Sequence, residues 1–223
     1  MPPPLVLSFD LDDTLWPIAP VILAAERELE SWLRLRHPRV MRAHDSSTLR
    51  AIREQVRLEN PDRSHDMTFL RHCAIMKLFG DRSTAKSHAD EAFEIFYAAR
   101  NRVTLYEDVA AALERLRRRY RLFALSNGNA DLERCGVSAL FDGHVTAIAA
   151  GASKPDARIF THLRRAAGVD AAQVLHIGDD PHADVHGATA AGMQAVWLNR
   201  DARPWPADLT PPARTISTLA QII

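Results

Sequence analysis

Short apolar runs recur along the chain, and each has the length of a buried strand rather than of a core helix. Continuous apolar runs of this kind are typical of a parallel sheet that is covered on both faces. The pattern therefore predicts five strands. They are expected at residues 5–10, 121–126, 144–149, 174–178 and 194–198.

Apolar residues at helical spacing precede the second, fourth and fifth of these strands. Alternating strands and helices imply right-handed crossovers, so the pattern predicts a doubly wound parallel α/β sheet. The residues that form these helical stripes are Val109, Ala112, Leu113 and Leu116, then Ile159, Phe160, Leu163 and Ala167, and finally Val185, Ala188 and Ala191.

The interval between the first two strands breaks this rhythm, because it has no strand pattern and carries three helical stripes instead. These stripes lie within residues 18–33, 67–78 and 85–96, with Pro38, Pro61 and Gly80 as breakers between them. An insertion just after the first strand belongs above the carboxyl edge of the sheet, where a lid over a site would lie. We therefore predict a core domain of residues 1–15 and 101–223, with a helical domain of residues 16–100 inserted into it.

Composition narrows the class of protein without identifying it. Apolar residues make up 47% of the 223-residue chain, and Lys plus Arg equal Asp plus Glu at 28 each, so the charge balance favours neither nucleic acid nor an anionic membrane as a partner. The first residues lack the basic and apolar regions of a signal peptide, and Cys73 and Cys135 give no disulfide framework. We expect a cytoplasmic protein that is a monomer or homodimer.

Three carboxylates follow the first predicted strand, at Asp10, Asp12 and Asp13. Crowded carboxylates repel one another and lose solvation, so their presence at a strand end favours a bound divalent metal over an Asp-rich turn that caps the next helix. Both interpretations remain open on this segment alone.

Polar residues also follow the other predicted strands. Parallel strands bring their carboxyl ends to one edge, so these residues are expected to form one site. Carboxylates, one lysine and one hydroxyl are what phosphoryl transfer with Mg²⁺ requires, because the metal and the lysine neutralise the phosphate while the hydroxyl positions its oxygens. The residues in question are Ser126 and Asn127 after the second strand, Lys154 after the third, and Asp179 and Asp184 after the fourth.

Together these segments resemble the four motifs of the haloacid-dehalogenase (HAD) superfamily, in order and over essentially the whole chain. The resemblance implies a Rossmann-like core in which the helical insertion is the C1 cap. It further implies that Asp10 is the nucleophile that forms an aspartyl-phosphate and that Asp12 is the general acid and base. The implied ligands of Mg²⁺ are the Asp10 carboxylate, the Asp12 backbone carbonyl and Asp179, with Asp184 completing or orienting the shell. The implied phosphate-binding residues are Ser126, Asn127 and Lys154.

Asp12 narrows the reaction class that this resemblance implies. Dehalogenases of the superfamily carry no acid two residues after the nucleophile, because halide leaves without a proton. A phosphatase is therefore expected, a phosphomutase is the weaker alternative, and a non-catalytic module on the same fold is the rival from another class. Asp13 and Asp180 are expected to have local turn or cap roles instead, because Asp is common in turns and helix caps.

The inserted domain, together with three segments of the core, carries a narrower resemblance. It is to bacterial phosphatases that act on flavin mononucleotide and on 5-amino-6-(5-phospho-D-ribitylamino)uracil. Sugar phosphates, nucleotides and phosphoglycolate remain alternative substrates, and His65-Asp66 could be a helix entry or a loop that faces the substrate. The segments that carry the resemblance are Pro20-Val21-Ile22-Leu23, Glu26-Arg27-Glu28, His37-Pro38, His65-Asp66-Met67-Thr68, Ser126-Asn127-Gly128-Asn129, Leu175-His176-Ile177-Gly178-Asp179-Asp180 and Gly192-Met193-Gln194-Ala195.

Overall fold

The computed structural model describes residues 2–44, 46–80 and 84–222. The chain divides into two compact units. One unit combines the segments before Ile18 and after Val103 and contains the sheet, and the other runs from Ile18 to Val103 and is helical. No helix in the described ranges combines the length and the apolar character that crossing a bilayer requires.

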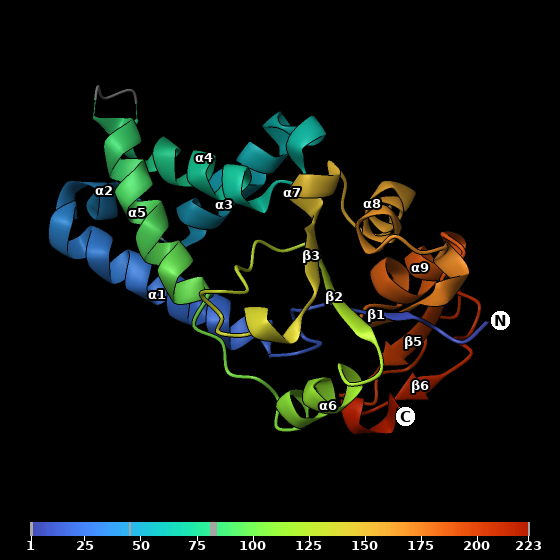
Figure 1. Ribbon diagram of the computed structural model, residues 1–223. Coiled ribbons are helices and arrows are strands. Elements are labelled where there is room, and N and C mark those ends of the chain that lie inside the picture. Colours follow the sequence, from blue (N-terminus) through green and yellow to red (C-terminus); the bar gives the residue numbers. More distant parts are fainter. Residues whose placement is uncertain (1, 45, 81–83, 223) are drawn as a thin grey trace. The chain divides into compact units, whose positions relative to one another are not determined.

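The first unit is built on a parallel sheet in the order β3-β2-β1-β4-β5-β6 (Figure 1). Phe9, at the end of β1, lies opposite Ala124 of β2 on one side and Ile177 of β4 on the other. The strands are β1 (Val6–Phe9), β2 (Arg121–Ser126), β3 (Gly143–Thr146), β4 (Val174–Gly178), β5 (Gln194–Leu198) and β6 (Thr215–Ile216).

Helices cover both faces of this sheet, with α8 and α9 on one side and α6 and η5 on the other (Figure 1). The doubly wound α/β fold is therefore confirmed. The helices and short helical turns of this unit are α6 (Val109–Leu116), η2 (Ser138–Leu140), α7 (Ala147–Ala150), α8 (Ala157–Ala167), η3 (Ala171–Gln173), the π-helical η4 (Pro181–His186), α9 (Gly187–Ala190) and η5 (Leu219–Ile222).

Helix α8 shows how the sequence builds one face of this core. The Asp156 side chain caps its first turn by accepting a hydrogen bond from the backbone N–H of Arg158, and Gly168 ends it with a φ of 63°, which glycine adopts without steric cost. Its apolar stripe, which includes Ile159 and Phe160, packs on Val6 and other residues of the sheet. This packing holds α8 against the strands whose ends carry the polar residues.

The second unit contains five α-helices and one short 3₁₀ turn among its described residues. Helix α1 packs on α5, α4 packs on both α3 and α5, and the Asp66 side chain caps α4 by accepting from the backbone N–H of Phe69. The interpretation of His65-Asp66 as the entry to a helix is thereby confirmed for Asp66. The elements are α1 (Ile18–Arg36), α2 (Pro38–Ala43), α3 (Ser46–Glu59), η1 (Pro61–Arg63), α4 (Met67–Phe79) and α5 (Ala85–Arg100).

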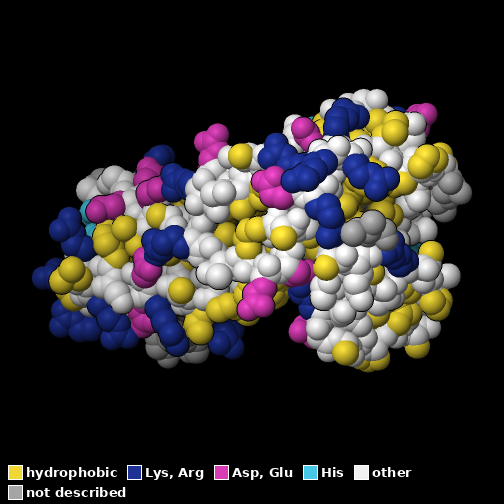
Figure 2. All heavy atoms as spheres, turned by 60° about the horizontal axis from the view of Figure 1, so that its bottom comes forward, with side chains coloured by type: hydrophobic (Ala, Val, Ile, Leu, Met, Phe, Trp, Pro, Cys, Tyr) yellow, Lys and Arg dark blue, Asp and Glu magenta, His cyan; other side chains and the backbone are white. Residues whose placement is uncertain are grey.

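The surface carries both signs of charge. Figure 2 shows Lys and Arg side chains on the same face of the molecule as Asp and Glu side chains, in keeping with the equal totals of 28 in the sequence.

The structure corrects the predicted elements in three places. Among the described residues the sheet has six strands, not five. The sixth, β6, was missed because it is only two residues long and leaves no recognisable apolar run. The third strand was predicted to run to residue 149 but ends at Thr146. The Thr146 side chain accepts a hydrogen bond from the backbone N–H of Ala149 and so starts α7 there. Helices α2 and α3 were not predicted. Pro38 was read as a breaker but begins α2, where its missing N–H costs nothing.

Candidate active site

The site is built where the order of the strands reverses, between β1 and β4. Asp10 comes directly after β1, and its backbone N–H donates to the carbonyl of Ile177 at 2.9 Å, so this residue is still tied to the neighbouring strand. Asp179 comes directly after β4. Open α/β sheets bind their ligands at the carboxyl ends of the strands at such a reversal.

Lys154 joins this edge from the segment between α7 and α8, and its side chain is 2% exposed. Its ammonium nitrogen Nζ lies 2.5 Å from Asp10 Oδ1, 2.6 Å from Asp184 Oδ1 and 2.9 Å from the carbonyl oxygen of Leu125. An ammonium group has three N–H donors, so every donor has an acceptor. The buried positive charge is therefore both hydrogen-bonded and paired.

The pKa values follow from this pairing. Burial opposes the charged form of Lys154, but the carboxylates of Asp10 and Asp184 outweigh it and hold the pKa of the ammonium above its usual range. Burial would also raise the pKa of Asp184, yet Lys154 and His176 hold it below its usual range. For Asp10, burial is the larger effect and raises the pKa, with Lys154 opposing it and Asp184 adding to it.

Asp184 is held in place by groups that the sequence alone did not single out. His176 Nε2 lies 3.1 Å from Asp184 Oδ1, and the backbone N–H of Asp180 donates to Asp184 Oδ2 at 3.0 Å. On the other side of the ring, Ser8 Oγ lies 2.9 Å from His176 Nδ1. Burial lowers the pKa of His176 despite Asp184, which favours the neutral ring. The tautomer that carries its proton on Nε2 matches both contacts, because it donates to Asp184 and accepts from the Ser8 hydroxyl at Nδ1.

A sequence signal for this buried chain did exist. Ser8 and His176 are polar residues inside the apolar runs of β1 and β4, and the two positions are direct partners in the strand register. Both are fully buried. A polar residue inside a buried strand needs a hydrogen-bond partner, so such a pair is a recognisable candidate for a supporting role.

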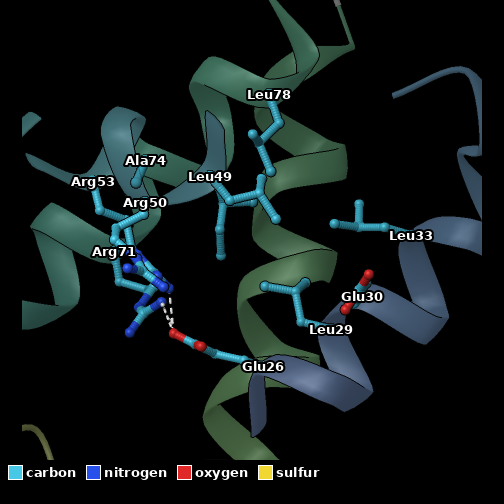
Figure 3. A pocket seen from close by; sticks show the side chains of 11 residues that line it. Glu26, Leu29, Glu30, Leu33, Leu49, Arg50, Arg53, Arg71, Ala74 and Leu78 are labelled. Atoms are coloured by element: carbon cyan, nitrogen blue, oxygen red, sulfur yellow. Dashed lines mark hydrogen bonds and ion pairs between the residues drawn. The ribbon is translucent and has the colours of Figure 1, made fainter. Parts of the chain in front are cut away.

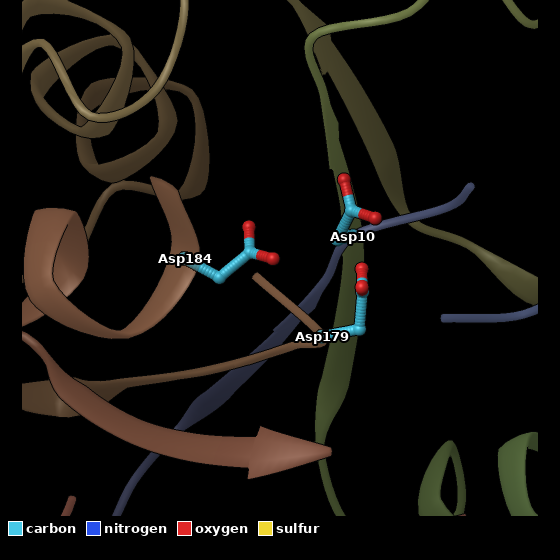
Figure 4. A group of neighbouring side chains, drawn as sticks. All are labelled: Asp10, Asp179 and Asp184. Carbon is cyan, nitrogen blue, oxygen red and sulfur yellow. The ribbon is translucent and has the colours of Figure 1, made fainter. Parts of the chain in front are cut away.

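Asp10, Asp179 and Asp184 form a group that could hold a metal ion, with one oxygen of each lying within 4.8 Å of the others. Figure 4 shows the three side chains coming from the end of β1, the end of β4 and η4. Oxygen ligands of this type suit hard divalent cations such as Mg²⁺.

Asp179 is anchored from two sides. The indole N–H of Trp197 donates to its carbonyl oxygen at 2.9 Å, and Arg203 donates to the same carbonyl at 2.7 Å and to Oδ2 at 3.0 Å. Burial and the charge of Asp184 raise the pKa of Asp179 to about 6, although Arg203 opposes the shift. Like-charge crowding of this kind is relieved when a cation binds.

The Asp12 carboxylate is not part of that group. It accepts a hydrogen bond from the indole N–H of Trp16 at 2.8 Å, and Trp16 itself is fully buried. Asp13 adopts a φ of 61° and its backbone N–H donates to the carbonyl of Trp16, so Asp13 belongs to the turn that joins Asp12 to Trp16. Asp180 caps η4 by accepting from the backbone N–H groups of His182 and Ala183. The turn and cap roles expected for Asp13 and Asp180 are confirmed.

Ser126 is the buried last residue of β2, and Asn127 follows it directly. The Ser126 hydroxyl oxygen accepts from the backbone N–H of Gly128 at 2.9 Å, which leaves its own O–H able to donate. The Asn127 amide is bonded twice to the backbone of Lys154, accepting from its N–H at 2.7 Å and donating to its carbonyl at 3.0 Å. Asn127 thus orients Lys154 with its side chain, so any contact that Asn127 makes with phosphate would fall to its backbone.

Comparison with known proteins identifies the class. The family model of the haloacid dehalogenase-like hydrolases matches residues 5–192. The chain belongs to this family, as its motifs predicted.

Among curated proteins, the chain is similar to the 5-amino-6-(5-phospho-D-ribitylamino)uracil phosphatase YigB of Escherichia coli K12. The two are 34% identical over 198 residues, which are 86% of this chain and 82% of YigB. The chain is also similar to a phosphoserine phosphatase of Thermus thermophilus, at 36% identity over 58% of this chain and 55% of that protein. The prediction of a HAD-family phosphatase is confirmed at this level.

Among solved structures, 2-haloacid dehalogenase from Pseudomonas syringae pv. Tomato DC3000 has a TM-score of 0.92. The two sequences are 36% identical, and the match covers 98% of this chain and 96% of the dehalogenase chain. The putative HAD-hydrolase YfnB from Bacillus subtilis has a TM-score of 0.69 at 19% identity, covering 99% and 97% of the two chains, and shows the shared fold.

Replacing Lys154 with methionine tests the charge balance of the site. The substitution leaves Asp10 and Asp184 buried without their cation, so in metal-free buffer near pH 7 the free energy of unfolding should fall by about 3–5 kcal/mol. The deficit should shrink as the pH is lowered, because protonation neutralises the stranded carboxylates in the folded state. Urea unfolding measures both effects.

Lys86→Met is the matched control, since Lys86 is exposed and pairs with the exposed Asp90. It should change the free energy of unfolding by less than about 1 kcal/mol. Equal stability of the Lys154 and Lys86 variants would contradict the proposed importance of the buried pair.

Proposed function

We propose that the chain hydrolyses phosphate monoesters through an aspartyl-phosphate on Asp10, with Mg²⁺ as cofactor. The observation that carries the proposal is the buried Asp10 carboxylate at the carboxyl edge of the sheet, paired with Lys154 and grouped with two further carboxylates. We propose further that the helical unit is the C1 cap domain of the family and that the enzyme is a cytoplasmic monomer or homodimer.

The residues fit Mg²⁺. The proposed ligands are the carboxylates of Asp10 and Asp179 and the backbone carbonyl of Asp12. Asp184 already accepts three hydrogen bonds, from Lys154, His176 and the Asp180 backbone, which leaves about one lone-pair position for the ion or for a water on it. When bound, the ion would neutralise the phosphate and its transition state.

Asp10 would attack phosphorus in line and displace the alcohol. Its Oδ1 is held by Lys154, which fixes the rotation of the carboxylate and balances the charge of the incoming phosphate. The Ser126 hydroxyl and the backbone N–H groups around Asn127 would donate to the phosphate oxygens. Lys154 is thus held in place before the substrate arrives.

Asp12 would carry the proton. It would protonate the leaving alcohol oxygen in the first step, and in the second step its carboxylate would take a proton from water as the water oxygen attacks phosphorus and releases Asp10. The Trp16 indole N–H bonded to Asp12 Oδ1 would orient the carboxyl group toward the reacting oxygen atoms.

Asp12 also supports a phosphatase over a haloacid dehalogenase. One similar structure is named a 2-haloacid dehalogenase, at 36% identity. An acid at this position serves an oxygen leaving group, whereas halide needs no proton. A phosphomutase uses the same acid and remains the weaker alternative.

For the substrate we propose flavin mononucleotide or 5-amino-6-(5-phospho-D-ribitylamino)uracil. The support is the similarity to YigB over 86% of this chain, which includes the helical segments and not only the site motifs. Sugar phosphates, nucleotides and phosphoglycolate are the alternatives. None of these substrates calls for a nucleic acid or a membrane as partner.

A substrate panel tests the reaction and its specificity together. We expect phosphate release from flavin mononucleotide and the ribitylamino-uracil phosphate to exceed that from sugar phosphates, nucleotides and phosphoglycolate, and we expect no halide release from 2-chloropropionate. Asp10→Asn is the control and should abolish release while leaving the fold intact. Flavin-type substrates at the bottom of the ranking would refute the narrow proposal, and halide release would refute the broad one.

Metal removal tests the ligand assignment. Treatment with EDTA should stop hydrolysis and added Mg²⁺ should restore it. Asp179→Asn should raise the Mg²⁺ concentration for half-maximal activity by at least about tenfold, because one anionic ligand is lost. Asp156→Asn is the matched control, since Asp156 caps α8 and belongs to no metal group among the described residues. Full activity in metal-free buffer would rule out the assignment.

Trp16→Phe tests how Asp12 is positioned. Loss of the indole N–H should lower kcat about tenfold for an alkyl phosphate, with a smaller loss for p-nitrophenyl phosphate, whose leaving group needs less protonation. Trp32→Phe, in the helical unit, is the control and should leave the ratio of the two rates unchanged. An equal loss on both substrates would argue against positioning of the general acid by Trp16.

A further inference from the structure

The helical unit contains a cavity of about 130 Å³ between α1, α3 and α4, and its lining differs in character from one side to the other (Figure 3). Four leucines line one side, two from α1 (Leu29 and Leu33), one from α3 (Leu49) and one from α4 (Leu78). The volume is close to that of an engineered apolar cavity, about 150 Å³, that binds benzene. It can hold the body of one small molecule.

Three arginines occupy the other side. Arg50 and Arg53 come from α3 and Arg71 from α4, and Figure 3 shows their side chains gathered near the carboxylate of Glu26. Glu26 accepts hydrogen bonds from Arg53 and, at 3.3 Å, from Arg71.

The carboxylates of the lining do not balance these arginines. Glu30 is the second carboxylate of the lining, but it pairs with Arg34 at 2.5 Å, outside the lining. Within the part of the chain that the structure describes, Arg50 has no ion-pair partner. Three guanidinium groups thus face one available carboxylate, and the cavity carries an excess of positive charge.

The three arginines differ in burial, with Arg50 exposed, Arg53 partly buried and Arg71 the most buried. The Arg71 side chain is only 17% exposed and its guanidinium lies 4.2 Å from the ring centre of Phe96. Burial and the charge of Arg53 lower the pKa of Arg71, although Glu26 opposes the shift. A second anion would relieve this repulsion, and the arginines are already held for it by helices that pack on one another.

We propose that this cavity binds a small organic carboxylate, with the carboxylate on the arginines and a short apolar body against the leucines. Guanidinium groups match a carboxylate in a planar, two-bonded geometry, and the apolar wall supplies affinity that an inorganic anion cannot gain. The inference stands on the helical unit alone and is independent of the reaction proposed for Asp10.

Titration of the full chain with benzoate tests the proposal, with affinity measured calorimetrically and the site mapped by amide chemical shifts. Benzoate should bind and shift amides of α1, α3 and α4. Benzylamine, which carries the opposite charge on a similar body, should not bind. Inorganic phosphate and acetate should bind at least about tenfold more weakly, because each lacks the apolar body.

Variants separate this cavity from other anion sites. Arg50→Gln should raise the Kd for benzoate about tenfold, since Arg50 is exposed and its loss spares the core. Arg57→Gln is the matched control on the same helix, where Arg57 pairs with Glu54, and it should leave the Kd unchanged. Glu26→Gln should lower the Kd, because it removes the carboxylate that competes for Arg53 and Arg71.

Three results would overturn the proposal. They are no binding of benzoate to the unmodified chain, equal affinity in the Arg50→Gln and Arg57→Gln variants, and binding that is lost in Asp10→Asn but kept in Arg50→Gln. The last result would assign the probe to the carboxylate site of the sheet instead. A phosphatase assay is not needed for any of them, so failure here leaves the proposed reaction untouched.

Discussion

The buried ammonium group of Lys154 is the interaction on which the arrangement of the site depends. It joins Asp10 after β1 to Asp184 on η4, two residues whose segments are neighbours only because the sheet brings them together. Without the ammonium, the two carboxylates would repel each other in a region with little water. With it, Asp10 and Asp184 can lie close together, as a site for a cation and a phosphate would require.

A layer of supporting hydrogen bonds keeps that charge in position. Asn127 holds the backbone of Lys154, His176 holds Asp184, and Ser8 holds His176. The strand register sets the last of these contacts, since Ser8 and His176 are partners in neighbouring strands. The residues behind the charged groups therefore determine where those groups lie.

The fold could be predicted well where apolar periodicity is strong and less well where the elements are short. The strands at residues 121–126, 174–178 and 194–198 were predicted with the bounds that the structure has, because continuous apolar runs end there at polar residues. The two-residue β6 and helices α2 and α3 were not predicted. A strand of two residues has no periodicity to detect, and proline begins a helix as readily as it ends one.

The sequence by itself determined the family and the chemistry available at four strand ends, because motif residues and strand patterns are local properties of the chain. It also indicated that Asp10, Lys154, Asp179 and Asp184 share one edge of the sheet. Only the tertiary structure decided the contacts of each side chain: that Asp12 faces Trp16 and that the Asn127 amide is bonded to Lys154. The same holds for the three arginines that gather around Glu26. The contacts of Asn127 with Lys154 and of the arginines with Glu26 depend on the packing of segments far apart in the chain, and the contact of Asp12 with Trp16 depends on the conformation of the turn between them. In each case a shift of about one ångström makes or breaks a hydrogen bond.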